Sequence, residues 1–468
     1  MHQAIFTAAM FVFGTSLSAQ YAGHWFGVLE AGAQRIPLDL ELAEADGQYT
    51  GGLLSPTQSS MPIPLSTVAT DGDSLQFAVA SVSMQFAGSL EGDSLEGSFR
   101  QGGFSAPLTF FREPSAAYTV LLAPDEIRPR PQEPTDFPYL QQAVTFVGGG
   151  EGVSLAGELT LPEDGSPRAA LVLISGSGPQ DRNQDLGPSI NHRPFLVLSD
   201  RLTRAGYAVL RYDDRGVGAS TGDFAAATSV DFAADAAAAI RFLRQRLGDQ
   251  DLPIGLAGHS EGGMIAPMVA AGDEAVDFVI LLAAPGLPID TLMAEQRRAI
   301  SGSTPPNEAV LATVAAYVKA HPDLADTVFR SGLRDTIIDR IPSLPESFRE
   351  SITDRDAFAA TYVNSLSGPW MRYFLAYDPT ANLSTLHVPV LAINGERDTQ
   401  VTPRNLEAIE ATLAAAGNPD VTVRLVPEVN HLLQPADTGL PSEYGQIETT
   451  VDEGVLTMIT DWLKARFP

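Results

Sequence analysis

The stretch PIGLAGHSEGGMIAPMVAA, residues 253–271, decides the fold of this chain. It begins with an apolar run, turns at GHSEGG (258–263), and continues into small and apolar residues. This is Gly-x-Ser-x-Gly between a strand and a helix, a pattern that places a serine on a strained turn with its hydroxyl above a sheet. A glycine-rich turn with an incidental serine is the alternative, because the five-residue pattern also occurs by chance. The flanking strand and helix, with the partners described below, favour Ser260 as a nucleophile.

Length and composition limit the classes of protein that fit. A chain of 468 residues is too long for one compact core, so we expect two domains or one domain with a large insertion. The hydrophobic fraction of 44% and the charged fraction of 18% indicate a globular protein. The formal net charge of −28 disfavours nucleic acid and anionic membrane surfaces as partners. Cysteine is absent, which excludes disulfides and thiolate chemistry.

Residues 1–19 have the features of a secretory signal peptide. An apolar core at 4–13 is too short to span a bilayer, and small residues at 16–19 suit cleavage. The segment before the core carries no Lys or Arg, so a buried N-terminal strand or helix is the alternative. We expect a periplasmic or secreted protein. No later stretch is long and apolar enough to predict a membrane span.

Residues 20–113 have the pattern of an all-β domain. Apolar and polar residues alternate at 36–42 and 74–80, and glycine-rich turns separate such runs. The sequence DGDSL (71–75) recurs as EGDSL (91–95). These loops predict hairpin turns, because they lack the further acidic ligands of a calcium loop. We predict seven or eight short antiparallel strands in a small barrel or sandwich.

A proline-rich stretch at 114–140 predicts a semi-rigid linker to a second domain at 141–468. In that domain apolar strands alternate with helices, which predicts a mostly parallel sheet with helices on both faces. Residues 287–378 interrupt the alternation with helices and proline breaks only. We expect this segment to form a helical cap inserted over the catalytic end of the sheet.

Two chemically competent residues follow later strands of this sheet. Asp398 comes after the strand predicted at 388–394, and His431 after that at 421–426. The carboxyl ends of parallel strands meet at one edge, so Ser260, Asp398 and His431 are expected to converge. Their order along the chain is that of an α/β-hydrolase. We predict a catalytic triad in which His431 takes the proton of Ser260 and Asp398 orients His431. Glu396 is the nearest alternative to Asp398.

The oxyanion hole and the substrate pocket are predicted from two other segments. The sequence SGSGP (175–179) follows a strand at the place where this fold has its second oxyanion donor. We assign the hole to the backbone N–H groups of Ser177, Gly178 and Glu261. Trp370 and Phe374, one helical turn apart in the cap, are candidates for the substrate pocket, with packing of the cap as the alternative. This mechanism calls for no cofactor and no metal ion.

Other polar residues near these motifs receive structural interpretations. In DDRG (213–216) we expect Arg215 to pair with Asp213 and Asp214 and to brace the turn. His259 adjoins the serine, and we expect its side chain to leave the turn in another direction. His192 has no acid nearby at a strand end and is interpreted as a surface or packing residue.

Five motifs together resemble one bacterial family of exported α/β-hydrolases, described as carboxylesterases or as serine-aminopeptidase-like proteins. They are SGSGPQDRN (175–183), DDRGVGAS (213–220), GHSEGG (258–263), NGERDTQV (394–401) and NHLLQ (430–434). The similarity covers about 140–468, and HWFG (24–27) resembles the start of an N-terminal domain that some members carry. Leu433 departs from the family, in which phenylalanine is common at this position.

The leading hypothesis is a serine carboxylic ester hydrolase that acts through an acyl-enzyme on a small-molecule ester, and the resemblance implies short acyl groups. A serine peptidase or aminopeptidase on the same triad is the first alternative. It must anchor a substrate ammonium, for which the cap offers acids such as Glu295, Asp323 and Asp326. The second alternative is an envelope- or glycan-binding protein that acts through its β-domain.

Overall fold

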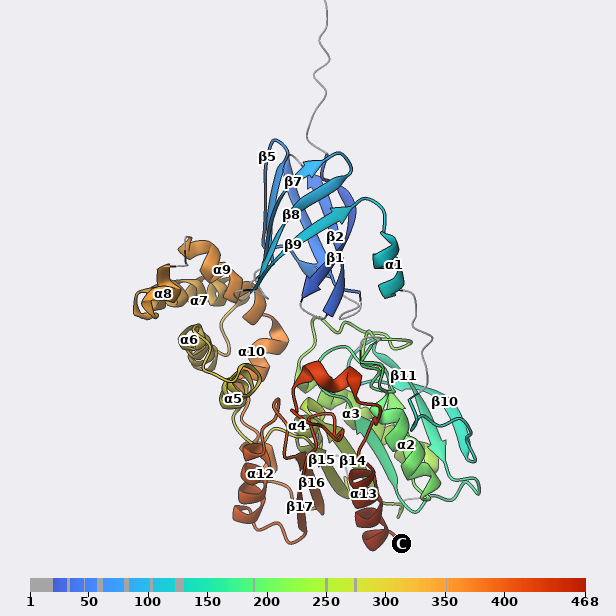
Figure 1. Cartoon of the computed structure of the whole chain (residues 1–468). Helices are drawn as coiled ribbons and strands as arrows, with labels where there is room; N and C mark the ends of the chain where they lie inside the picture. Colours follow the sequence, from blue (N-terminus) through green and yellow to red (C-terminus); the bar gives the residue numbers. More distant parts are fainter. Residues whose placement is uncertain are drawn as a thin grey trace, which may run out of the picture. The chain divides into compact units, whose positions relative to one another are not determined.

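The computed structural model describes residues 20–468 except 32–33, 46, 57–61, 80–83, 102–103, 123–129, 188–189, 249–250, 273–275, 351 and 353. The chain divides into two compact units, Met1–Asp125 and Glu126–Pro468 (Figure 1). The expected signal peptide at 1–19 lies outside the described residues. No helix in the described ranges combines the length and apolar character needed to cross a membrane.

The first unit is built on one antiparallel sheet of nine strands in the order β4-β3-β2-β1-β9-β8-β7-β6-β5. Every second side chain faces the interior, so Leu38, Leu40 and Leu42 of β2 are all buried. The repeated loops are hairpin turns, with Gly72 and Gly92 at φ +58° and +64°. The nine strands exceed the seven or eight predicted, because β4 has only two residues and no alternating pattern by which the sequence could reveal it. The strands are β1 (Gly23–Ala31), β2 (Gln34–Ala45), β3 (Gln48–Leu54), β4 (Ile63–Pro64), β5 (Thr67–Asp71), β6 (Ser74–Val79), β7 (Met84–Glu91), β8 (Ser94–Gln101) and β9 (Phe104–Phe111).

A short helix, α1 (Ala116–Leu122), occupies part of the stretch predicted as a proline-rich linker. The prediction is wrong for these residues because they include no proline and have a local helix start. The hydroxyl of Ser115 accepts the backbone N–H of Tyr118 at 3.1 Å, as an N-cap residue does. Tyr118 is buried with its ring against that of Phe26, at a centroid distance of 5.4 Å.

The second unit contains an eight-stranded sheet in the order β10-β11-β13-β12-β14-β15-β16-β17 (Figure 1). The pairs β10–β11 and β11–β13 are antiparallel, and all other neighbours are parallel. This mostly parallel sheet with helices on both faces confirms the predicted α/β-hydrolase fold. The strands are β10 (Leu140–Val147), β11 (Ser154–Leu161), β12 (Ala170–Ile174), β13 (Ala208–Tyr212), β14 (Ile254–His259), β15 (Phe278–Leu282), β16 (Val390–Gly395) and β17 (Val421–Val426).

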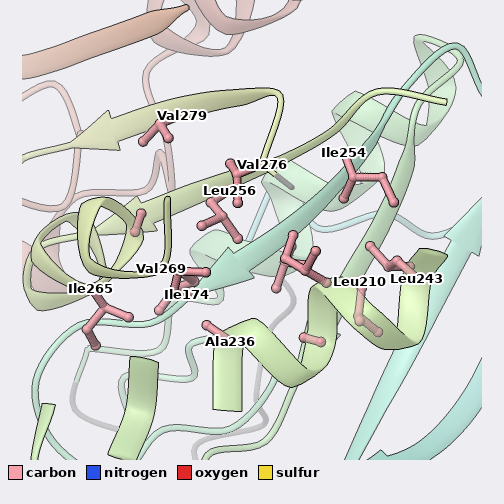
Figure 2. Packing of buried hydrophobic residues seen from close by; sticks show 14 of the residues in the cluster. Ile174, Leu210, Ala236, Leu243, Ile254, Leu256, Ile265, Val269, Val276 and Val279 are labelled. Atoms are coloured by element: carbon pink, nitrogen blue, oxygen red, sulfur yellow. The ribbon is translucent and has the colours of Figure 1, made fainter. Parts of the chain in front are cut away.

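Helices cover both faces of this sheet and create two apolar cores. Helices α3, α4 and α12 pack on one face, and α2 and α13 on the other. Figure 2 shows the first core, in which Leu243 of α3 and Ile265 of α4 lie in one cluster with Ile254 and Leu256 of β14. The central strands therefore have no solvent-exposed face, which explains their continuous apolar sequences. The helices are α2 (Pro194–Arg204), α3 (Ser229–Leu247), α4 (Glu261–Ala270), α12 (Arg404–Ala415) and α13 (Glu453–Arg466).

The segment between β15 and β16 is helical and forms the cap. Figure 1 shows its helices as a group apart from those that flank the sheet. The cap has its own apolar core around Val314, Phe329 and Leu333, and a second cluster joins Phe374 of the cap to Met264 of α4. Its helices are α5 (Ile289–Ser301), α6 (Glu308–Ala320), α7 (Asp326–Arg340), α8 (Glu346–Glu350), α9 (Arg355–Leu366) and α10 (Pro369–Ala376), followed by α11 (Thr380–Leu383).

Candidate active site

Ser260 occupies the tight turn between β14 and α4. Its backbone has φ +55° and ψ −119°, a conformation that costs energy for a residue with a Cβ. The surrounding structure holds it there, because the N–H of Ser260 donates to the carbonyl of Leu282 and its own carbonyl accepts from Gly263, both at 2.9 Å. The turn leaves the serine side chain partly exposed while its neighbours on both sides are buried.

The glycines of the motif are required by close approach of the backbone. A Cβ on Gly258 would lie 2.0 Å from the carbonyl oxygen of Gly262. A Cβ on Gly262 would lie 2.1 Å from the carbonyl oxygen of Ile174, at the end of β12. Both distances are far inside van der Waals contact, so only glycine lets the start of α4 pack against β12 and β14.

The structure brings the three predicted triad residues together. Nε2 of His431 lies 3.1 Å from Oγ of Ser260, and Nδ1 of His431 lies 2.9 Å from Oδ2 of Asp398. Oδ1 of Asp398 accepts the backbone N–H groups of Gln400 and Val401, each at 2.8 Å. These two donors hold the carboxylate in one orientation, so that its second oxygen faces the imidazole.

Glu396, the alternative acid, does not take part in this arrangement. Its side chain is exposed, and one of its carboxylate oxygens accepts the backbone N–H of Glu428 at 3.3 Å. By contrast, Asp398 and His431 are both buried. Burial shields their hydrogen bond from competing water, which strengthens it.

The predicted oxyanion donors lie on the two segments that flank Ser260. Glu261 is the first residue of α4, and the backbone N–H of a first helical residue has no acceptor within its own helix. The loop after β12 passes next to the serine, since a Cβ on Gly176 would lie 3.2 Å from the Cβ of Ser260. Ser177 follows on this loop with an exposed side chain, and Gly178 has φ +95°. A small pocket is lined in part by Gly176 and Gly178 of this loop and by Glu261 of α4.

The two predicted pocket residues of the cap are stacked on each other. The rings of Trp370 and Phe374 are 4.7 Å apart and nearly parallel. Phe374 is buried in the cluster between the cap and α4, which is the packing role considered as the alternative. Trp370 is only half-buried, and its indole N–H donates to Oε1 of Glu261 at 2.9 Å. This bond links α10 of the cap directly to the residue after the nucleophile.

The side chain of Glu261 was missed by the sequence analysis, which used only its N–H. The carboxylate is buried, and its Oε1 accepts a second hydrogen bond from the hydroxyl of Ser229 at 2.6 Å. Ser229 is the first residue of α3. The available signal was that Glu261 is a charged residue in the otherwise apolar sequence of α4. A buried carboxylate without a partner is costly, so its presence there predicts a buried hydrogen-bond donor.

The ion pairs of the DDRG turn differ from the prediction. Arg215 binds Asp235 and Asp231 of α3, with 2.7 Å between its Nε and Oδ2 of Asp235. Asp213 pairs with Arg182, 2.6 Å between Oδ2 and Nη2. The expected pairing of Arg215 with its own neighbours is wrong, because the turn directs Arg215 to α3 while Asp213 is bonded to Arg182 and Asp214 to Ser175.

Asp214 lines the same small pocket as Gly176 and Gly178. Its carboxylate accepts hydrogen bonds from the Ser175 hydroxyl at 2.9 Å and the Gln180 N–H at 3.0 Å. Burial raises the pKa of Asp214 to about 7, against the effect of those donors, and the nearby carboxylates of Glu261 and Asp235 raise it further. The Asp214 carboxyl therefore takes up a proton at a much higher pH than an ordinary aspartate does.

His259 is buried behind the triad. Its Nδ1 lies 2.8 Å from Nε2 of Gln184, and its Nε2 lies 2.9 Å from the backbone carbonyl oxygen of His431. Burial lowers the pKa of His259 to about 3, and the proximity of His431 lowers it further, against the raising effect of the backbone hydrogen bond. The side chain does leave the turn away from the serine, as predicted, but it meets the main chain of the base.

A family model for serine aminopeptidase S33 (Hydrolase_4) matches residues 193–435, just over half of the chain. The chain belongs to this hydrolase family. The match begins at the start of α2 and ends after His431, so it includes Ser260, Asp398 and the whole cap.

Comparison with individual proteins found a named sequence relative and similar solved structures. Esterase EstD of Thermotoga maritima is 26% identical over 378 residues, which cover 78% of this chain and 77% of that protein. Among solved structures, the esterase Pf2001 of Pyrococcus furiosus aligns with a TM-score of 0.42 and 16% identity, over 72% of this chain and 94% of that one. Proline iminopeptidase of Mycobacterium smegmatis aligns with a TM-score of 0.41 and 17% identity, over 69% and 98%.

Proposed function

We propose that this member of the family is a serine carboxylic ester hydrolase that acts on short-acyl esters through an acyl-enzyme on Ser260. The observation that carries the proposal is the continuous chain of hydrogen bonds from Ser260 through His431 to Asp398. The name of the 26% identical relative, an esterase, supports the same reaction class. The acid, base and nucleophile of acyl transfer are then all supplied by the chain itself.

In the proposed mechanism, Nε2 of His431 accepts the hydroxyl proton as Oγ of Ser260 attacks the ester carbonyl carbon. The carbonyl oxygen becomes an oxyanion and accepts the backbone N–H groups of Glu261 and Ser177. Each such donor contributes roughly 10²–10³ in rate. Collapse of the tetrahedral intermediate expels the alcohol, which takes the proton from His431. A water molecule, activated by His431 in the same way, then attacks the acyl-enzyme. Collapse of this second intermediate breaks the bond to Oγ of Ser260, returns the proton to Oγ and releases the carboxylic acid.

We infer the preference for short acyl groups from the resemblance of the five sequence motifs to a family whose members with assigned activity favour short acyl esters. The small pocket next to Glu261 is lined by apolar side chains such as Phe224 and Ile265, but also by the carboxylates of Asp214 and Asp235, so we do not assign the acyl chain to it. Trp370 of the cap donates its indole N–H to Glu261, and we propose that its ring lines the substrate site.

The family description makes a peptidase the second candidate, but the acids considered for ammonium binding do not favour it. Glu295 already pairs with Arg404 and accepts the hydroxyl of Thr402 at 2.7 Å. Asp323 and Asp326 are exposed on the cap surface. A carboxylate engaged in an ion pair, or fully hydrated, gains little from a substrate ammonium.

The test compares kcat/KM of the full chain on nitrophenyl esters of increasing acyl length with kcat/KM on aminoacyl anilides. We expect the short esters to be the best substrates, and Ser260→Ala to abolish turnover of all of them while the protein stays folded. Faster hydrolysis of the anilides would establish the peptidase instead. Full activity of Ser260→Ala would refute both.

A further inference from the structure

We propose that His259 is a positioning residue for His431: as a neutral imidazole held by Gln184, it fixes the main chain of the catalytic base relative to the nucleophile. This inference rests on the proposed function, since His431 must act as the base for its position to matter. It assigns a role in the reaction to His259, the second residue of the Gly-His-Ser-Glu-Gly motif, whose ring contacts Gln184 and the backbone of His431.

The hydrogen-bond partners determine the protonation state of His259. The carbonyl oxygen of His431 can only accept, so Nε2 of His259 carries a hydrogen and donates to it. The amide nitrogen of Gln184 can only donate, so Nδ1 of His259 is bare and accepts from it. A single neutral tautomer satisfies both contacts. Burial, which also lowers the pKa of His259, keeps the ring neutral.

The three linked residues come from three separate segments of the site. Gln184 belongs to the loop that follows the oxyanion segment, His259 ends β14 one residue before the nucleophile, and His431 lies on the loop after β17. The rigid ring of His259 therefore connects the strand that precedes Ser260 to the backbone of His431. This connection does not run through the flexible side chain of His431. The distance between Ser260 Oγ and His431 Nε2 depends on this tie.

Two further features indicate that the contact is specific. Gln184 has φ +57°, so its backbone holds a strained conformation that brings its buried amide to the ring. His259 and Gln184 both line a pocket whose other walls are mainly apolar side chains, among them Phe195, Leu282 and Leu433. Apolar surroundings do not supply the partners that a replacement water needs, so a lost bond to the His431 carbonyl is not recovered.

The base loop has other supports, which define what His259 adds. Oδ1 of Asn430 accepts the backbone N–H groups of Leu432 and Gln434, each at 3.0 Å. These bonds shape the turn internally and do not connect it to β14. Among the described residues, the side chain that joins the backbone carbonyl of His431 to the nucleophile strand is that of His259.

The experiment uses a pair of isosteric variants in the full chain. In His259→Gln the amide nitrogen occupies the place of Nε2 and keeps the bond to the His431 carbonyl. In His259→Asn the amide reaches only the place of Nδ1 and keeps the bond to Gln184. We expect His259→Asn to lower kcat for a short nitrophenyl ester by about 10²-fold, the cost of an ångström-scale misplacement. KM should change little, since the base does not bind the ground-state ester. His259→Gln should recover most of kcat.

Equal kcat losses in the two variants would overturn the proposal, because they would show a packing role for the ring. So would a His259→Asn enzyme with kcat close to that of the parent. Gln184→Met provides a second measurement if His259→Asn does not fold. It removes the donor that holds Nδ1 of the His259 ring, so the ring is no longer fixed in orientation and kcat should fall with KM preserved; an unchanged kcat refutes the inference. Ser260→Ala separates the two proposals: full activity of this variant refutes the proposed function, whereas an inactive Ser260→Ala with indistinguishable His259 variants refutes only the positioning role.

Discussion

Replacing Asp398 by asparagine tests the triad through a single proton. Oδ1 of Asp398 faces two backbone N–H groups at 2.8 Å, and both can only donate. In Asp398→Asn the amide oxygen must take that position, because an NH₂ group there would meet two donors. The NH₂ group then faces Nδ1 of His431, which must become an acceptor. The hydrogen of the imidazole moves to Nε2, where it blocks removal of the Ser260 proton.

The expected loss follows from this change of tautomer. A serine-protease triad whose imidazole is in the wrong tautomer loses about 10⁴ in kcat. That factor corresponds to about 5.5 kcal/mol of transition-state stabilisation. The fold should persist, because the amide keeps both backbone hydrogen bonds and nearly the same volume.

The assay is the release of nitrophenolate from a short-acyl nitrophenyl ester near neutral pH, with circular dichroism to verify folding. Glu396→Gln is the matched control, since that exposed carboxylate follows the same strand and should leave kcat unchanged. Our reasoning fails if Asp398→Asn keeps kcat within about tenfold of the parent, or if Glu396→Gln is the variant that loses activity.

Three other predictions concern the elbow, the cap and the pH dependence of stability. In Gly262→Ala the added Cβ, 2.1 Å from the carbonyl oxygen of Ile174, should displace the start of α4 and lower kcat by about 10²–10³ through loss of an oxyanion donor; steady-state kinetics on a short ester that match the parent would contradict this. Trp370→Phe keeps an aromatic ring but removes the donor to the buried carboxylate of Glu261, so urea denaturation should show about 1–3 kcal/mol less stability, and an unchanged midpoint would count against the bond. Burial, with the positive charge of Arg130 nearby, lowers the pKa of His192 from 6.5 to about 4. The contribution of His192 to stability is therefore present above pH 6.5 and is lost as the pH falls toward 4, at about 1.4 kcal/mol per pH unit. Denaturation curves of His192→Asn should show a shallower dependence of stability on pH than those of the parent, and equal slopes would refute the assignment.

The architecture around the site was accessible from sequence because it depends on periodic patterns. Continuous apolar runs followed by helices predict buried parallel strands, and their order places Ser260, Asp398 and His431 each after the end of a different strand. The cap was recognisable for the complementary reason that it has helices without strands.

Side-chain partners were much less accessible. Arg215 has acids beside it in sequence, yet it binds Asp231 and Asp235 on α3, because rotamers and backbone direction select among several nearby charges. Similarly, no local pattern shows that the side chain of Glu261 bonds the indole of Trp370, which is 109 residues away.

The amino-acid sequence by itself determined the order of strands and helices, the glycines that permit the strained turn, and the chemical types that follow each strand. Those are local properties, set by backbone conformation and by the period of apolar residues. Only the tertiary structure decided which polar atoms meet: that the His259 ring bonds the backbone carbonyl of His431, and that the carboxylate of Glu261 bonds the indole of Trp370. Such contacts join distant segments, and their geometry exists only after the two cores have packed and brought the loop ends to the same edge of the sheet.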